Sequence, residues 1–146
     1  TAHLISGPDI VDGIQSAWKG KERSGGVLLL AQMSSRGNLL IPSYTATVAE
    51  HGSKHPGVFG FIGNGSKPSG ISELRKLVGH SKLIWTPGIN LAVGDGAKGQ
   101  RYGDPYEAVL SGSDCIIVGS GIHGKGDPAV EAAKYAQASW KGIMER

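Results

Sequence analysis

The sequence predicts an α/β protein whose strands form a parallel β-sheet. Four short apolar runs recur along the 146 residues, and their starts lie roughly 30 residues apart, which is the length of a strand–helix unit. Each run is continuous rather than alternating, which is typical of strands buried on both faces of a parallel sheet. Segments with helical spacing of apolar residues separate the runs. We therefore expect a single domain over 1–146, with one helix followed by four strand–helix units.

The predicted strands are the four apolar runs, at 27–33, 58–62, 83–86 and 115–118. The first helix is predicted over 7–18, where Pro8 stands near the start and apolar residues recur at helical spacing. The second helix is predicted over 43–52, and Gly52 is its expected stop signal. A weaker helical pattern covers 72–79.

Two further helices carry stronger start signals. In the segment 104–112, Asp104 stands at the N-cap position, Pro105 at the first helical position and Glu107 at the third. In the last helix, 128–144, Asp127 is the expected N-cap. The spacing predicts that Val130, Ala133, Gln137 and Trp140 lie along one stripe of that last helix.

Composition narrows the class of protein. Apolar residues make up 39% of the chain, the formal net charge is +3 and the isoelectric point is about 9.1. That mild excess suits an anionic ligand but lacks the dense basic patch of a nucleic-acid binder. No apolar run approaches the ~18 residues of a membrane span, and the start of the chain resembles neither a signal nor a transit peptide. A single cysteine, Cys115, fits a reducing setting, so we expect a cytoplasmic protein.

Two long glycine-rich loops, 63–70 and 88–104, follow the second and third predicted strands. Loops of this length in a compact domain are usually functional. Both leave the carboxyl ends of their strands, where α/β barrels and open sheets place their sites. The five histidines show no metal-ligand spacing with cysteines or carboxylates, so no metal site is expected.

The fourth predicted strand runs directly into Gly-Ser-Gly-Ile-His-Gly at 119–124, which matches the dinucleotide fingerprint G-x-G-x-x-G. That fingerprint requires a second strand with an acidic residue about 20 residues further on, and here a single helix completes the sequence. The glycines could simply permit a tight turn. They could also form a phosphate cradle after the last strand of a barrel. The long loop 88–104 after the preceding strand favours the phosphate cradle.

Five segments resemble orotidine 5′-monophosphate decarboxylase, a (β/α)8-barrel family that converts orotidylate (OMP) to uridylate (UMP). The opening TAHLISGPDIVDGI and the later segments LLLAQMSSRGNL, WTPGI, GDGAKGQRYGDP and GSDCIIVGSGI occur in the family's order. They span nearly the whole chain. The resemblance implies the C-terminal part of a TIM (β/α)8 barrel, about four to five βα units, incomplete without an N-terminal half.

The resemblance also implies roles for individual residues. Ser34 would hydrogen-bond the pyrimidine ring and Pro87 would line the base pocket. Gln100 and Tyr102 would reach the phosphate from a mobile loop. The turn Gly119, Ser120 and Gly121 would offer its backbone N–H groups to the same phosphate, with Arg101 nearby. No cofactor is implied.

The chain departs from the family pattern at three places. Ser120 replaces an arginine, so a charge-assisted contact to the phosphate is lost, and Arg101 or Lys125 could replace part of it. Gln32 stands where the family usually has glutamate. The family's catalytic array, Asp-x-Lys-x-x-Asp, does not occur in these 146 residues, so no catalytic residue is assigned.

The leading interpretation is the OMP- and UMP-binding part of a decarboxylase of pyrimidine biosynthesis. It would act with an N-terminal half of the barrel, and the resemblance implies a homodimer. The alternative is a non-catalytic phosphate- or nucleotide-binding half-barrel that self-associates to cover its sheet edges.

Overall fold

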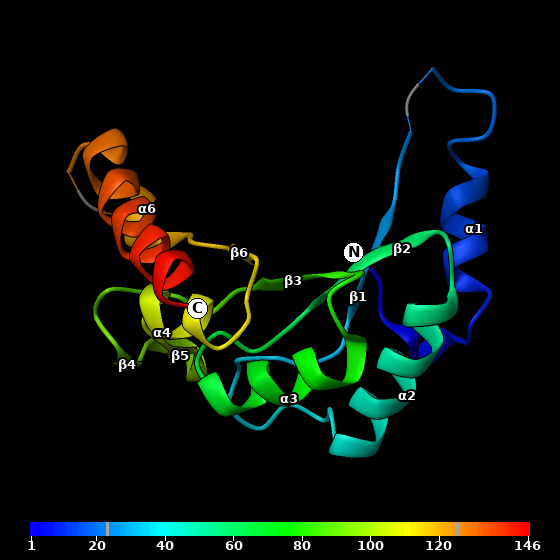
Figure 1. Cartoon of the computed structure of the whole chain (residues 1–146), viewed down its shortest axis with the longest axis horizontal. Coiled ribbons are helices and arrows are strands. Elements are labelled where there is room, and N and C mark those ends of the chain that lie inside the picture. The colour runs from blue at the N-terminus through cyan, green and yellow to red at the C-terminus, as the bar shows by residue number, and fades with distance from the viewer. Residues whose placement is uncertain (23, 125) are drawn as a thin grey trace.

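The computed structural model describes residues 1–22, 24–124 and 126–146. It contains a four-stranded parallel sheet in the order β1 (Val27–Leu30), β2 (Val58–Ile62), β3 (Leu83–Thr86) and β6 (Cys115–Ile116). Each strand therefore lies beside the next one along the chain, as in successive strand–helix units (Figure 1). The predicted parallel α/β arrangement is confirmed.

Six α-helices accompany the sheet among the described residues. They are α1 (Ile10–Ser16), α2 (Pro42–Lys54), α3 (Pro68–Val78), α4 (Pro105–Leu110), α5 (Ser120–His123) and α6 (Pro128–Glu145). Two 3-10 turns, η1 (Leu4–Ser6) and η2 (Ala97–Gly99), and a small hairpin of β4 (Gly94–Asp95) and β5 (Arg101–Tyr102) complete the secondary structure. The predicted caps of α4 and α6 are confirmed: the side chain of Asp104 accepts from the Glu107 N–H and that of Asp127 from the Ala129 N–H.

Two of the differences between predicted and observed helix boundaries have a clear physical reason. Gly52 does not end α2, which continues to Lys54. A Cβ at Gly52 would lie 2.6 Å from the Phe61 ring, so this glycine permits close helix–sheet packing rather than a stop. The predicted loop 63–70 is also too long, because α3 already begins at Pro68, a residue suited to the first helical position.

The strands β1 and β6 are shorter than predicted. Beyond Leu30, the N–H groups of Ala31 and Gln32 both donate to the Ile62 carbonyl. The regular ladder therefore ends there, and the chain turns away from β2. This bend begins the segment that carries Ser34.

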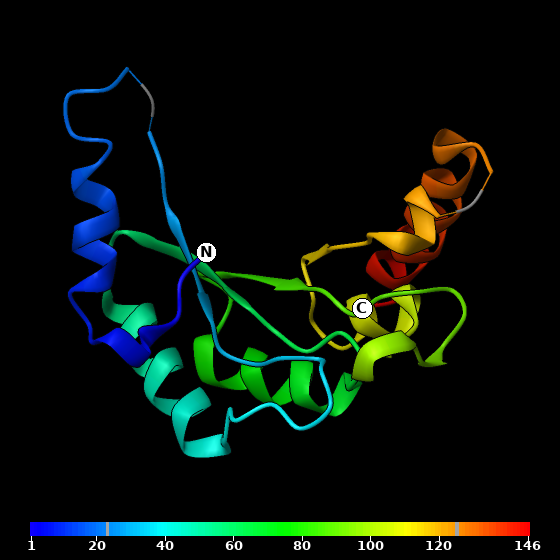
Figure 2. The ribbon, with the colours of Figure 1, turned by 180° about the vertical axis from the view of Figure 1, so that it is seen from behind.

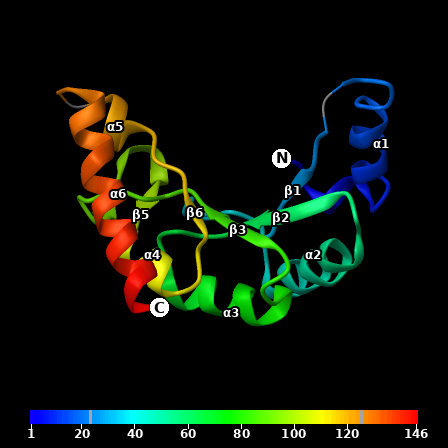
Figure 3. The same ribbon diagram turned by 45° about the horizontal axis from the view of Figure 1, so that its top comes forward.

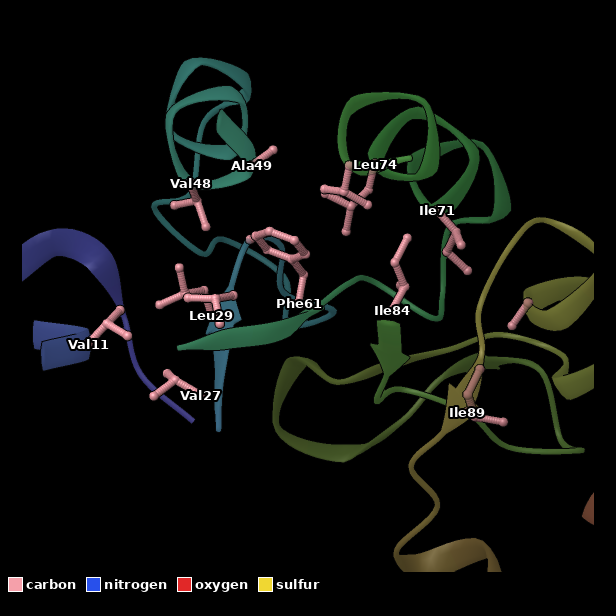
Figure 4. Close-up of a cluster of buried hydrophobic side chains, with 14 of the residues drawn as sticks. Val11, Val27, Leu29, Val48, Ala49, Phe61, Ile71, Leu74, Ile84 and Ile89 are labelled. Atoms are coloured by element: carbon pink, nitrogen blue, oxygen red, sulfur yellow. The ribbon is translucent and has the colours of Figure 1, made fainter. Parts of the chain in front are cut away.

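The hydrophobic core lies between one face of the sheet and the helices α2 and α3 (Figure 4). Leu29, Phe61 and Ile84 project from β1, β2 and β3 and are fully buried. They meet buried residues of α2 and α3, namely Val48, Ala49, Ile71 and Leu74. Burying each such side chain is worth about 1.5–3 kcal/mol, so this layer holds the sheet against its two helices.

The opposite face of the sheet carries no helix in the described residues, while α1 and α6 stand at its two ends (Figures 2 and 3). A bulge in β2 places Phe59 on this face, where its ring meets that of Trp85 edge-on at 6.3 Å between centroids. Phe59, Leu83 and Ile117 remain 40–41% exposed. The prediction that the strands are buried on both faces is therefore confirmed only in part. Leu28 and Ile62 are buried on the face without helices, whereas the three residues named above stay partly exposed there.

None of the helices in these described ranges is both long and apolar enough to cross a bilayer.

Candidate functional site

The candidate site lies at the carboxyl ends of the four parallel strands. Ser34 follows β1, Pro87 and Gly88 follow β3, and the turn at Gly119 follows β6. Gly88 has a φ of +78°, and a Cβ there would lie 2.6 Å from the Cβ of Ser34. Only glycine satisfies both the left-handed backbone and this close approach, so the Thr-Pro-Gly segment is fitted directly against Ser34.

Ser34 is buried and joins two distant parts of the sequence. Its hydroxyl accepts a hydrogen bond of 2.8 Å from the Nε2 of Gln100, which also donates to the Arg101 carbonyl at 2.7 Å. Ser34 was predicted to contact the base and Gln100 the phosphate. The structure brings these two residues together although they lie 66 positions apart in the sequence. We refer to this contact as the Ser34–Gln100 clasp.

The loop 88–104 is folded rather than structureless. Its two ends are joined by hydrogen bonds from Gly103 N–H to the Gly88 carbonyl at 2.8 Å and from Asn90 N–H to the Gly103 carbonyl at 3.0 Å. Its tip forms the β4–β5 hairpin, and the Tyr102 ring lies directly over Gly96. Asp95 pairs with the exposed Arg36 guanidinium. The loop is thus held over the segment that carries Ser34.

The side chain of Arg101 is oriented differently from those of the other residues predicted to bind the phosphate. Its Nε donates to the Ser34 carbonyl at 3.1 Å, and its side chain lines a cavity of about 350 Å³ together with Lys67. None of the residues of the turn 119–121 lines that cavity. Lys125, the other candidate to replace the missing arginine, lies outside the described residues.

The glycine turn after β6 leads into the short helix α5, which was not expected before Pro128. Gly119 is the N-cap residue and Ser120 the first helical residue, and both are exposed. The first N–H groups of a helix have no acceptor within it. At the end of the strand these donors suit an anion, as the phosphate-cradle hypothesis requires.

Tyr135 of α6 is a structural link beside the site that the sequence reasoning missed. It is 3% exposed, and its hydroxyl accepts from the Leu91 N–H at 3.2 Å and lies 3.4 Å from the Oδ1 of Asn90. A Cβ at Gly121 would lie 2.0 Å from that hydroxyl oxygen. Tyr135 therefore joins the start of the loop 88–104 to the turn after β6.

The stripe predicted along the last helix is not its buried face. Val130 and Trp140 are 54% and 63% exposed, whereas Tyr135 and Gly142 are the buried residues of α6. Gly142 packs against the Tyr106 carbonyl and Val109 of α4. The buried stripe contains a tyrosine with a polar tip and a glycine, so hydrophobicity alone pointed to the opposite face.

Among the residues that the structure describes, the site offers hydrogen-bond donors without an acid–base pair. The described residues hold no cluster of three or more metal-ligating side chains. Burial raises the pKa of the Cys115 thiol, and the neighbouring Asp114 charge raises it further, so the thiol is protonated at neutral pH. A hydroxyl, an amide and backbone N–H groups can bind and orient a polar anionic ligand, but they cannot supply a proton-transfer chemistry.

The curated relatives of this chain are similar to it over nearly its whole length. The Schizosaccharomyces pombe orotidine 5′-phosphate decarboxylase is 38% identical over 147 residues, which cover 99% of this chain and 52% of that protein. The Rhizopus oryzae orotidine 5′-phosphate decarboxylase is 36% identical over 148 residues, which cover 99% of this chain and 52% of that protein. The chain therefore spans about half the length of the curated relatives it matches.

The solved structures agree on the fold. The Pyrococcus horikoshii decarboxylase superposes with a TM-score of 0.72 at 25% identity, covering 94% of this chain and 59% of that one. The Methanocaldococcus jannaschii enzyme, complexed with the inhibitor BMP, superposes with a TM-score of 0.72 at 24% identity, covering 93% and 58%. The expectation of a partial TIM barrel is thereby confirmed.

A family model described as orotidine 5′-phosphate decarboxylase / HUMPS matches residues 1–135. The family predicted from the five sequence segments is confirmed, and the chain belongs to the orotidine 5′-phosphate decarboxylase / HUMPS family.

Proposed function

We propose that this chain forms the substrate-binding part of an orotidine 5′-phosphate decarboxylase that converts OMP to UMP and carbon dioxide in the cytoplasm. Ser34 and Pro87 contact the pyrimidine. Gln100, Tyr102 and the turn at Gly119, Ser120 and Gly121 contact the phosphate. The observation that carries this proposal is the Ser34–Gln100 clasp, because it joins the base side to the loop that would close over the phosphate.

Arg101 has a supporting role in this proposal. Its Nε–H already donates to the Ser34 carbonyl, so it holds the closed loop against the segment that binds the base. The phosphate would then be held by neutral donors at Gln100, Tyr102 and the glycine turn. Such contacts are roughly half as strong as charge-assisted ones, so each would hold the phosphate less strongly than an arginine in the place of Ser120.

The bond-breaking step needs groups from outside these 146 residues. Loss of carbon dioxide leaves an electron pair on the pyrimidine carbon, which then takes a proton, and an ammonium beside that carbon both stabilises the charge and supplies the proton. The site described above holds no such group. Lys82, for example, donates to the His55 and Val58 carbonyls, near the amino end of β2. An N-terminal half of the barrel would supply the lysine and its flanking carboxylates.

The nucleotide site is tested by calorimetry of the chain, combined with an N-terminal half where binding requires it. We expect UMP to bind more tightly than AMP, because the base pocket is built for a pyrimidine. Ser34→Ala should weaken UMP binding by about 1–2 kcal/mol, since the Gln100 amide loses its buried acceptor. Ser35→Ala, at the neighbouring half-buried serine, is the matched control. Equal affinities for UMP and AMP would contradict the proposal.

Ser120→Arg should strengthen the phosphate contact. A guanidinium at the first position of α5 adds a charge-assisted hydrogen bond to the anion, worth about 1–2 kcal/mol if it reaches the phosphate. Uridine, which has no phosphate, should bind both proteins alike. The measurement is the ratio of UMP to uridine affinity in the two proteins, and an unchanged ratio would place the phosphate elsewhere.

The open face of the sheet should make the isolated chain associate. Phe59, Leu83 and Ile117 are exposed there, and an apolar sheet face in water favours contact with another protein surface. We propose that the N-terminal half of the barrel covers this face and that the complete protein is a homodimer. Sedimentation of the isolated chain should show dimers or larger species. A monodisperse 15.1 kDa monomer with full decarboxylase activity would be incompatible with this proposal.

A further inference from the structure

The cavity beside Arg101 is distinct from the proposed nucleotide site. It measures about 350 Å³ and lies between α2 and α3, with walls from the segment after β1, the segment after β2 and the loop 88–104. Pro87, Gln100, Tyr102 and the turn 119–121 do not line it. Its volume falls within the usual range for small-molecule sites.

Both helices that flank this cavity belong to this chain, and they cover the packed face of the sheet (Figure 1). An N-terminal half of the barrel that packs on the open face would therefore leave the cavity accessible.

The polar walls of the cavity are already satisfied. The amide of Gln32 donates to the Gly70 carbonyl at 2.9 Å and accepts from the Asn64 N–H at 3.0 Å. The amide of Asn38 donates to the Ser35 carbonyl at 2.7 Å and accepts from the Leu40 N–H at 3.1 Å. These neutral groups fix the shape of the cavity. The groups left to bind a ligand are its charged side chains.

The charged side chains of the cavity favour an anion. Lys67 and Arg101 both line it, and in the described part of the chain neither forms an ion pair with a carboxylate. Glu73 is the single acidic residue of the lining and is exposed. Leu40 and Leu77 add apolar surface. Two cations against one exposed carboxylate leave a net positive cavity with an apolar wall.

Arg101 also connects the cavity to the loop. Its Nε donates to the Ser34 carbonyl, and the preceding residue, Gln100, forms the Ser34–Gln100 clasp. Arg101 belongs to the loop 88–104, whereas Lys67 belongs to the segment before α3, so any opening of the loop would carry Arg101 away from Lys67. A ligand that contacts both cations therefore binds the closed loop better than the open one, and its binding shifts the loop toward closure.

We propose that this cavity binds a small organic anion, with an oxyanion head group between Lys67 and Arg101 and an apolar body against Leu40 and Leu77, and that binding favours closure of the loop 88–104. This inference goes beyond the proposed nucleotide site and does not require it.

The test is a nuclear magnetic resonance titration of the full chain with phenyl phosphate, benzoate and neutral benzyl alcohol. Both anions should shift the amide signals of Leu40, Gly70 and Leu77 and the Nε–H signal of Arg101, and benzyl alcohol should bind at least tenfold more weakly. Hydrogen exchange at the Gly96 and Gly103 amides, which bond within the loop, should slow at least threefold with either anion. If phenyl phosphate alone binds, the cavity selects phosphate, and the proposed class narrows to phosphate esters.

Variants separate the cavity from the nucleotide site. Lys67→Met removes an exposed charge and should weaken the binding of phenyl phosphate at least tenfold. Lys76→Met, within α3 but outside the lining, should leave that affinity unchanged. Gln32→Glu, which adds a negative charge to the wall, should also weaken binding. Equal affinity in wild type and Lys67→Met, or shifts confined to Gly119–Gly121, would overturn the inference. Failure of UMP to bind would count against the proposed function alone.

Discussion

Gly121→Ala is expected to abolish measurable UMP binding by displacing Tyr135. The added Cβ would lie 2.0 Å from the tyrosine oxygen and 2.9 Å from the ring carbon that carries it, so the ring has to move. The hydroxyl then loses its hydrogen bonds to Leu91 and Asn90, and the loop 88–104 loses its connection to the turn after β6. Overpacking costs about 1–3 kcal/mol, and each lost hydrogen bond adds about 0.5–1.5 kcal/mol.

A double-mutant cycle identifies this clash as the cause. Tyr135→Phe removes the oxygen that the new methyl group would meet, so Gly121→Ala should cost less in that background than in the wild type. Gly13→Ala is the matched control, because a Cβ at Gly13 of α1 meets nothing within 4 Å. There alanine should be neutral or stabilising by up to about 1 kcal/mol. The measurements are urea unfolding and UMP calorimetry. Additive effects at Gly121 and Tyr135 would disprove the clash.

The fold was predictable because each of its units has a local signal. Continuous apolar runs located the four strands, and Asp104 and Asp127 located the starts of α4 and α6 through their caps. The order of the strands followed, because sequential strand–helix units place neighbouring strands side by side. Where a local signal had two physical meanings, the prediction was wrong: the glycine at position 52 serves packing against Phe61, not helix termination.

The predicted site residues follow the carboxyl ends of the strands, but the contacts between them were not predictable. No periodicity reveals that Gln100 reaches Ser34, because that hydrogen bond depends on how two loops fold over the sheet edge. Arg101 was expected near the phosphate, and its direction toward Ser34 and Lys67 is a property of the β4–β5 hairpin. Tyr135 escaped notice because its polar tip binds loop residues that are distant in the sequence.

The open face of the sheet shows a further limit of periodicity. A continuous apolar run predicts that both faces of a strand are buried, but it does not predict which chain covers each face. Here α2 and α3 cover one face, and Phe59 and Leu83 remain exposed on the other. The apolar pattern therefore describes the complete barrel of the family rather than this segment of it.

Stability should depend more on Arg75 than on any exposed ion pair of the chain. Its side chain is 12% exposed and donates to the carbonyls of Gly79, Lys82 and Gly112 and to the carboxylate of Asp114. Asp114 in turn accepts from the Ile84 N–H at 2.8 Å. One guanidinium thus joins the end of α3 to β3 and to the segment before β6.

Arg75→Met should therefore lower the free energy of unfolding by about 3–5 kcal/mol, because it leaves the Asp114 carboxylate half-buried without its main partner. Arg36→Met breaks the pair with Asp95, whose side chains are 62% and 64% exposed, and should cost about 0–1 kcal/mol. Arg75→Lys keeps the charge but cannot reproduce the planar fork of donors, so its cost should fall between the two. Urea unfolding of the three variants at one protein concentration makes the comparison, since association of the chain would otherwise shift each transition. Equal losses for Arg75→Met and Arg36→Met would show that the buried network contributes no more than a surface pair.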